Sequence, residues 1–256
     1  MSENNTYNKL IEYLKDFISI ERFDRINEVL DQRTNHLTIV LEDLHKAHNA
    51  NAVLRSCDGF GIQDVHIIEN RNEFDSAGTV SIGAHNWLTL HRYNSETENN
   101  IDRCFNDLRD QGYQIIATTP HEQDSNIDQL DITKRTALVF GTELEGVSEE
   151  VTEKVEGFVK IPMYGFSESF NISVSAAICM FELTKRIRSS NNDWHLMDDY
   201  KTKLRYQWIK QTIKAGDQLV AKFLNENDLR LKLERRLIDI ERDGRNQTYT
   251  MKEDKM

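Results

Sequence analysis

The chain repeats one pattern that few folds can accommodate, in which short apolar runs of strand length are separated by stretches of helical periodicity. Four of these runs are LTIVL (residues 37–41), DVHII (64–68), YQIIAT (113–118) and TALVF (136–140). Short apolar runs between polar loops are typical of strands buried on both faces. Strands that alternate with helices form a parallel sheet. The sequence therefore predicts an α/β domain between about residues 36 and 188.

Polar or glycine-containing loops follow three of the predicted strands, after Thr118, Phe140 and Ile161. The carboxyl ends of parallel strands meet at one edge of the sheet, where ligands commonly bind. We therefore predict a small-molecule site built from these loops. The third loop leads into a small and apolar segment, residues 171–183, which predicts a buried helix that begins at Asn171. The alternative is an ordinary strand-to-helix turn, because Ser and Asn are common turn residues.

A second candidate region follows the first strand, where a polar loop opens a predicted helix with Asn49 as its N-cap. Asn51 and Arg55 are four residues apart, so they share one face of that helix. The planar guanidinium of Arg55 can hold a phosphate. An ion pair between Arg55 and Asp58 is the alternative, and this segment alone favours neither.

Composition and motifs exclude several classes of protein. No run of about 18 apolar residues exists, so no membrane span is expected, and no secretory signal is visible. Three widely spaced cysteines favour a reducing cytoplasm over a disulfide framework. His45 and His48 have the spacing of metal ligands but no third partner nearby, so no metal site is predicted. Neither a dinucleotide motif nor a P-loop is present.

The charge of the chain is uneven. A net charge of −11 counts against a nucleic-acid partner, but residues 181–246 carry 15 Lys and Arg against 11 Asp and Glu. Two helices are predicted there, over residues 200–223 and 227–240. Aromatic residues alternate with basic ones in a way that suits RNA, although solvated helix faces are the alternative. The basic residues are Lys201, Lys203, Arg205, Lys210 and Lys214.

Three stretches resemble the three motifs of the TrmH family, within the SPOUT superfamily of methyltransferases. They are HNANAVLRSCDGFG from His48, LVFGTELEGVSEE from Leu138, and IPMYGFSESFNISVSAA from Ile161. The motifs occur in the order that the family has, and the resemblance covers about residues 36–188. The segment before the first motif and the basic C-terminal helices are most similar to the bacterial tRNA guanosine 2′-O-methyltransferases of this family.

The resemblance implies an α/β fold with a parallel sheet and a C-terminal trefoil knot, flanked by helices at both ends. It divides the chain into an N-terminal helical extension (1–35), a SPOUT methyltransferase domain (36–190), basic C-terminal helices (191–242) and a mobile tail (243–256). It also implies S-adenosylmethionine as methyl donor, an active site formed across a homodimer, and a tRNA substrate methylated on the D-loop guanosine numbered 18. A ribosomal RNA substrate and a non-catalytic RNA-binding scaffold are the alternatives.

The same resemblance implies roles for individual residues. Catalytic positions match Asn49, Arg55, Glu143, Ser169 and Asn171, and donor-binding positions match Thr118, Gly141, Ile161, Met163, Phe170 and Ser173. An arginine is a poor base, because its pKa exceeds about 12. Whether Arg55 removes a proton or orients a hydroxyl and a phosphate is therefore left open. Asn51 stands where the most similar family members usually have Ser.

Overall fold

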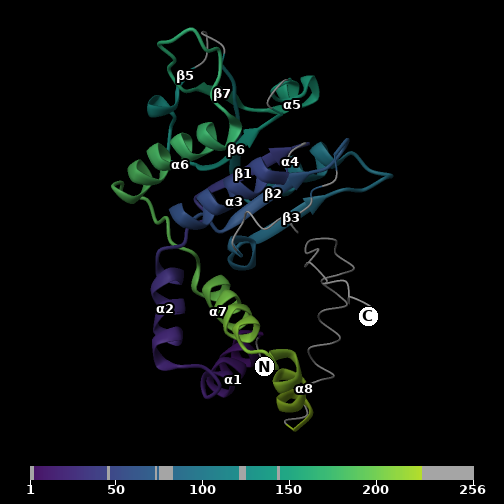
Figure 1. The fold of residues 1–256 in the computed structure, drawn as a ribbon, viewed down its shortest axis with the longest axis vertical. Coiled ribbons are helices and arrows are strands. Elements are labelled where there is room, and N and C mark those ends of the chain that lie inside the picture. The colour runs from purple at the N-terminus through teal and green to yellow at the C-terminus, as the bar shows by residue number, and fades with distance from the viewer. Residues whose placement is uncertain are drawn as a thin grey trace. The chain divides into compact units, whose positions relative to one another are not determined.

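The computed structural model describes residues 3–44, 47–72, 74, 83–120, 125–142 and 145–226 (Figure 1). The chain forms two compact units. The sheet unit comprises Thr34–Trp194, and the helical unit combines Met1–Arg33 with the segment that begins at His195. The predicted helix over residues 227–240 and the predicted tail lie outside the described residues.

Seven strands form one sheet in the order β3-β2-β1-β6-β4-β7-β5, and every pairing between them is parallel. The predicted parallel sheet is therefore confirmed. Strand β5 was not predicted, because two polar residues give no apolar run. The trefoil knot stays a prediction. The strands are β1 (Leu37–Glu42), β2 (Asp64–Ile68), β3 (Thr89–Tyr93), β4 (Tyr113–Thr118), β5 (Ser125–Asn126), β6 (Arg135–Phe140) and β7 (Gly157–Lys160).

Helices cover both faces of the sheet (Figure 1). Residues of α3 (Ala47–Phe60) and α6 (Ile172–Arg188) share one hydrophobic cluster with Ile39 of β1. Residues of α4 (Asn100–Asp110) and α5 (Glu149–Lys154) share a second cluster with Val40, on the opposite face. Coverage of both faces explains why the strands read as unbroken apolar runs. Two short 3₁₀ helices, η2 (Ala84–Trp87) and η3 (Ile127–Gln129), complete the unit.

Local capping signals fix where several helices begin and end. Asn171 caps α6 by accepting a hydrogen bond from the Ser173 N–H at 2.9 Å, as predicted. Ser148 caps α5, as predicted, by accepting from the Val151 N–H at 3.2 Å. After α4, Gly112 has a φ of 80°, a left-handed conformation that ends a helix with least strain at glycine.

The helical unit contains α1 (Glu3–Lys15), α2 (Ile20–Asp31), α7 (Asp198–Thr212) and α8 (Gly216–Glu226). The predicted break near Ser19 is confirmed, because Ser19 caps α2. The prediction of one helix over residues 200–223 is wrong. The chain turns after α7, and Gly216 packs so tightly there that a Cβ atom would lie 2.1 Å from the Lys210 carbonyl oxygen.

Trp208 of α7 does not belong to an exposed aromatic surface, contrary to the RNA-facing pattern expected from the sequence. Its side chain is 3% exposed, and the Arg33 guanidinium lies 5.2 Å from its ring centroid. The alternation of aromatic and basic residues on α7 therefore follows from packing within the helical unit. None of the helices among the described residues is long and apolar enough to cross a membrane.

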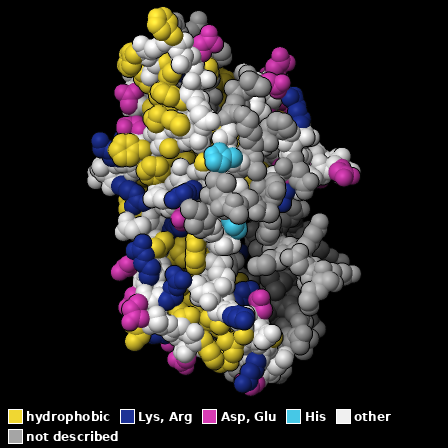
Figure 2. All heavy atoms as spheres, in the orientation of Figure 1, with side chains coloured by type: hydrophobic (Ala, Val, Ile, Leu, Met, Phe, Trp, Pro, Cys, Tyr) yellow, Lys and Arg dark blue, Asp and Glu magenta, His cyan; other side chains and the backbone are white. Residues whose placement is uncertain are grey.

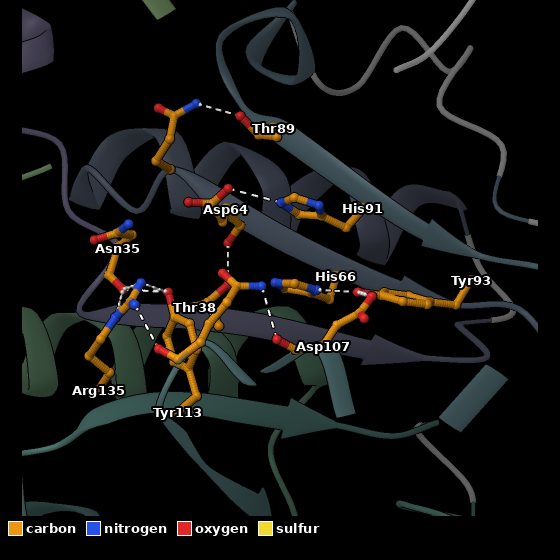
Figure 3. Close-up of polar contacts among 12 residues, drawn as sticks. Asn35, Thr38, Asp64, His66, Thr89, His91, Tyr93, Asp107, Tyr113 and Arg135 are labelled. Carbon is orange, nitrogen blue, oxygen red and sulfur yellow. Dashed lines mark hydrogen bonds and ion pairs between the residues drawn. The ribbon is translucent and has the colours of Figure 1, made fainter. Parts of the chain in front are cut away.

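A buried polar network lies between the sheet and α4 (Figure 3). The His66 ring stacks on His91 with centroids 4.5 Å apart, and its Nδ1 lies 3.1 Å from the Tyr93 hydroxyl. That hydroxyl donates to Asp107 of α4 at 3.2 Å, while His91 Nε2 lies 2.9 Å from Asp64. Burial, and secondarily the neighbouring His91, lower the pKa of His66 well below its ordinary value.

We expect this network to make the protein sensitive to acid. Below the ordinary histidine pKa of about 6.5, the unfolded chain binds a proton at His66 that the folded chain does not bind. His66 should therefore weaken the stability of the fold progressively as pH falls below about 6, and should have no such effect above about 7. Urea unfolding of wild type and His66→Gln between pH 5 and pH 8 checks this. The variant should show a shallower slope against pH, whereas Tyr93→Phe, which keeps His66 buried, should keep the wild-type slope. Equal slopes for wild type and His66→Gln would contradict the prediction.

Candidate functional site

The three predicted loops leave adjacent strands at one edge of the sheet. Strands β6, β4 and β7 are neighbours, and their carboxyl ends carry Gly141, Thr118 and Ile161 in that order. Thr118 ties the three strands together, because it is paired with Val159 of β7 and its hydroxyl donates to the Val139 carbonyl of β6 at 3.0 Å. The sheet therefore brings these three predicted donor-binding positions to one edge.

Gly141 opens a tightly closed loop after β6. A Cβ atom at this position would lie 2.0 Å from the Gly146 carbonyl oxygen, a separation that no side chain can tolerate. Thr142 and Gly146 close the loop by exchanging two backbone hydrogen bonds, of 2.8 and 3.1 Å. The loop is thus shaped by direct contact between backbones, which requires glycine.

The loop after β7 is open to solvent. Residues 164–171 are all exposed, and this run includes Ser169 and Phe170, while Met163 is half-buried. The Asn171 side chain ends the loop and reaches back to α3, because its Nδ2 lies 3.5 Å from the Asn49 Oδ1. Its Oδ1 accepts from both the N–H and the hydroxyl of Ser173, at 2.9 and 2.6 Å. Asn49, Asn171 and Ser173 therefore form one connected group.

Helix α3 supplies Asn49 and Arg55 in different environments. The expectation that Asn49 caps α3 is wrong, because the helix already begins at Ala47 and Asn49 lies buried in its first turn. Arg55 is exposed, and in the described part of the chain no salt bridge joins it to Asp58. The guanidinium is thus available to a ligand from solvent.

Asn51 and Arg55 lie four residues apart on α3, as predicted, but their exposure differs. Asn51 is fully buried, and neither polar atom of its amide has a hydrogen-bond partner among the described residues. Its burial is set by the tertiary packing of α3, which spacing along one helix does not reveal. A buried amide left unpaired costs free energy.

Two predicted catalytic residues are not attached to the Asn49–Asn171 group. Among the described residues, no hydrogen bond or ion pair links Arg55 or Ser169 to it. Glu143 lies outside the described residues, as does His45. Within the part of the chain that is described, no group of three His, Cys, Asp or Glu side chains is placed to hold a metal ion.

Sequence reasoning assigned no role to two carboxylates at the end of β1. Glu42 and Asp43 line a cavity of about 700 Å³ together with Asn70, Arg71, Glu145 and Ser148, and none of the predicted site residues that the structure describes lines it. Glu42 is 3% exposed, and burial is the main cause that raises its pKa. A carboxylate at the end of a fully apolar strand is the sequence signal that identifies this residue.

Asp43 holds the loop that follows β2. Its Oδ1 accepts from the backbone N–H groups of Asn70 and Arg71 at 2.7 and 2.8 Å. Its φ of 49° lies in the left-handed region, which few side chains other than Asn and Asp adopt. Arg71 is thereby placed where its guanidinium meets the Glu145 carboxylate at 2.9 Å.

The sequence that forms this sheet and these loops matches a known family of enzymes. Residues 36–181, more than half of the chain, match the model of the SpoU rRNA Methylase family. The chain belongs to this family. The matched residues begin one position before β1 and end within α6, so the SpoU match spans all seven strands and the three loops described above.

Curated relatives and solved structures agree with that assignment. The chain is 41% identical to a tRNA (guanosine(18)-2′-O)-methyltransferase of Borreliella burgdorferi, over 80% of this chain and 92% of that protein. A Thermus thermophilus enzyme of the same name is 34% identical over 73% of this chain and 95% of its own length. The TrmH/SpoU tRNA modifying enzyme of A. aeolicus superposes with a TM-score of 0.63 at 27% identity, covering 75% and 97% of the two chains. The predicted resemblance to the TrmH family is confirmed.

A further solved structure shows the same fold at greater sequence distance. The SpoU methyltransferase AviRb from Streptomyces viridochromogenes, in complex with AdoMet, superposes with a TM-score of 0.54 at 21% identity. The superposition covers 64% of this chain and 62% of the AviRb chain. This similarity concerns the fold.

Proposed function

We propose that this protein transfers a methyl group from S-adenosylmethionine to the ribose 2′-hydroxyl of a tRNA guanosine, at position 18 of the D-loop. The observation that carries the proposal is the 41% identity to a tRNA (guanosine(18)-2′-O)-methyltransferase, extending over 92% of that relative. A substrate in ribosomal RNA is the second candidate, because a 23S rRNA (guanosine-2′-O-)-methyltransferase of Haemophilus ducreyi is 29% identical. The higher identity and coverage favour tRNA. The buried thiols of Cys57, Cys104 and Cys179 agree with a cytoplasmic protein.

The residues at the ends of β4, β6 and β7 suit the methyl donor. Thr118, Gly141, Ile161, Met163 and Phe170 are uncharged, and they offer apolar surface and backbone groups to an adenine ring and a thioether chain. The direct backbone contact at Gly141 keeps the β6 loop compact and leaves no room for a side chain there. S-adenosylmethionine supplies an activated methyl group on a positively charged sulfur, so the protein has only to bind and orient the two reactants.

We assign Arg55 to the acceptor hydroxyl and to a neighbouring phosphate. Its exposed guanidinium presents five donors in a fixed plane and stays protonated, so it orients and polarises groups more readily than it removes protons. The linked amides of Asn49 and Asn171 hold the start of α3 against the start of α6. Ser169 and Glu143 are assigned to the same site by their positions in the family motifs. Positioning of this kind supplies a large part of the rate in reactions between two bound partners.

The helical unit is proposed to contact tRNA through lysines that are not used in packing. Lys201 pairs with Asp31 at 3.2 Å and Lys210 with Asp217 at 2.7 Å, so both are partly neutralised. Among the described residues, Lys203 and Lys214 have no such partner. Free cations of this kind displace counterions from phosphates, which makes binding depend on salt.

We further propose a homodimer that uses an exposed apolar side of α6. Figure 2 shows hydrophobic side chains exposed over the part of the sheet unit where Figure 1 draws α6. Val174 and Phe181 are 44% and 56% exposed, and they lie seven residues apart, on one side of the helix. Phe170 precedes them at 40% exposure. Large apolar side chains grouped in this way mark association surfaces.

Methyl transfer to unmodified tRNA transcripts tests the proposed reaction. Wild-type protein with labelled S-adenosylmethionine should label the transcript, and mapping should place a 2′-O-methyl group on guanosine 18. A transcript with another base at that position is the matched control and should stay unlabelled. Labelling of 23S rRNA fragments instead would support the proposed reaction but show that the substrate is ribosomal RNA. No labelling of either RNA, together with no binding of S-adenosylhomocysteine, would contradict the proposal.

Arg55→Ala should abolish turnover while leaving the fold and donor binding intact, because the exposed side chain makes no described contact within the chain. We expect kcat to fall by a factor of about 10² or more, the effect typical of losing a charged orienting group. Single-turnover methylation and calorimetry with S-adenosylhomocysteine measure the two effects separately. Arg55→Lys keeps the charge but loses the planar fork, so intermediate activity is expected. Turnover that persists in Arg55→Ala would refute the assigned role.

Phe181→Asp should convert the protein to monomers, because a carboxylate would be buried without a partner in an apolar interface. Analytical ultracentrifugation at micromolar concentration measures the oligomeric state. Phe17→Asp is the control, since Phe17 is similarly exposed at 47% but belongs to the helical unit. A wild-type protein that sediments as a monomer would rule out this dimer, and an unchanged dimer in Phe181→Asp would place the interface elsewhere.

A further inference from the structure

The loop between β6 and α5 is held from outside by one buried carboxylate. Glu42, the last residue of β1, accepts a hydrogen bond from the Ser148 N–H through its Oε2 at 2.9 Å. Ser148 is the N-cap of α5 and ends the loop that Gly141 begins. Glu42 is 3% exposed and Ser148 is half-buried, so this contact is partly shielded from solvent. A carboxylate that accepts a backbone N–H in such surroundings makes a strong hydrogen bond.

Val147 packs against the second hydrophobic cluster, and the other described contacts of this loop lie within it or join exposed side chains. The Thr142–Gly146 hydrogen bonds and the close approach at Gly141 lie within the loop itself. The external contact between Arg71 and Glu145 joins side chains that are 67% and 71% exposed. Exposed ion pairs contribute little to holding a structure. The Glu42 hydrogen bond and the packing of Val147 therefore hold this loop against its surroundings more firmly than the exposed ion pair does.

Glu42 also stands at the start of the segment that carries Asn49 and Arg55. It ends β1, Asp43 follows it in a left-handed conformation, and α3 begins at Ala47. A single side chain thus connects the chain leaving β1 with the loop leaving β6. Both segments carry residues of the proposed site.

We propose that Glu42 is a positioning residue for methyl transfer, whose carboxylate sets the place of the 141–148 loop and thereby the affinity for the methyl donor. This inference rests on the proposed function, since it concerns the same donor site. Glu42 lies behind the loop and lines a cavity with none of the donor-binding residues, so it acts through the loop and not by touching the reactants.

Three substitutions separate this role from a general effect on stability. Glu42→Gln keeps an oxygen that can accept the Ser148 N–H, so donor affinity should stay within about threefold of wild type. Glu42→Ala removes the acceptor and should weaken S-adenosylhomocysteine binding about tenfold to hundredfold, the equivalent of one charge-assisted hydrogen bond. Val40→Ala is the matched control, because Val40 is fully buried two residues earlier on the same strand face and its side chain cannot accept a hydrogen bond from the loop. It should lower the unfolding temperature but leave donor affinity unchanged.

Hydrogen exchange supplies a measurement that does not depend on activity. In Glu42→Ala the Ser148 amide and the 141–148 loop should exchange faster, while the amides of β1 should keep their protection. In Val40→Ala the change should instead spread over the sheet. If Glu42→Ala does not fold, Glu42→Asp tests the proposal in its place. This variant keeps a carboxylate but moves it away from the Ser148 N–H by the length of one methylene group. It should then bind the donor more weakly than Glu42→Gln does.

The outcomes distinguish this inference from the proposed function. Wild-type protein that fails to bind S-adenosylhomocysteine would overturn the proposed function. If the wild-type protein binds S-adenosylhomocysteine, and Glu42→Ala and Glu42→Asp bind it with the same affinity, only the proposed role of Glu42 is overturned. An equal loss of donor affinity in Val40→Ala would also overturn it, because the effect would then follow from stability alone.

Discussion

The parallel hydrogen-bond ladder through β1, β6, β4 and β7 is the constraint on which the site depends. Parallel strands place every carboxyl end at one edge, so the segments that follow these four strands leave the sheet together. The pairing of Thr118 with Val159 fixes the relative height of two of the loops. A slip by one residue would turn each side chain to the opposite face of the sheet, where a different hydrophobic cluster lies.

The elements that the sequence revealed are those with a local signal. Apolar runs located the main strands, and the side chains of Asn171 and Ser148 marked helix starts because capping involves neighbouring residues only. The strand order had no such signal, since it depends on crossovers between distant segments. Asn51 shows the same limit within one helix, because spacing predicts which residues share a face but not that tertiary packing buries Asn51. The family motifs supplied roles that pattern reasoning alone did not reach.

The loop after β6 shows how two different constraints combine in one segment. Gly141 allows the backbone to approach Gly146 closely, and the Thr142–Gly146 hydrogen bonds close the loop at that point. These contacts lie within the loop and do not by themselves fix where it lies. The Glu42 carboxylate acts on one of those ends, at Ser148, so shape and placement come from separate residues. The glycine was recognisable from its motif, whereas the partner of the carboxylate became evident only from the contact between Glu42 of β1 and Ser148.

Two buried titratable groups on the α4 and α5 side of the sheet, His66 and Glu42, change stability with pH in opposite directions. Burial lowers the pKa of His66, so its neutral form suits the fold at neutral pH. Burial raises the pKa of Glu42, so its contribution to stability is greatest below the ordinary carboxyl pKa of about 4.3 and is lost as pH rises through the raised value. The hydrogen bond from Ser148 opposes this rise, because it favours the ionised form of Glu42. Burial and hydrogen bonding thus act on this carboxylate in opposite directions, whereas an apolar side chain would avoid the cost of burial altogether. The hydrogen bond to Ser148 is what an apolar side chain could not supply, and it places the start of α5 against the end of β1.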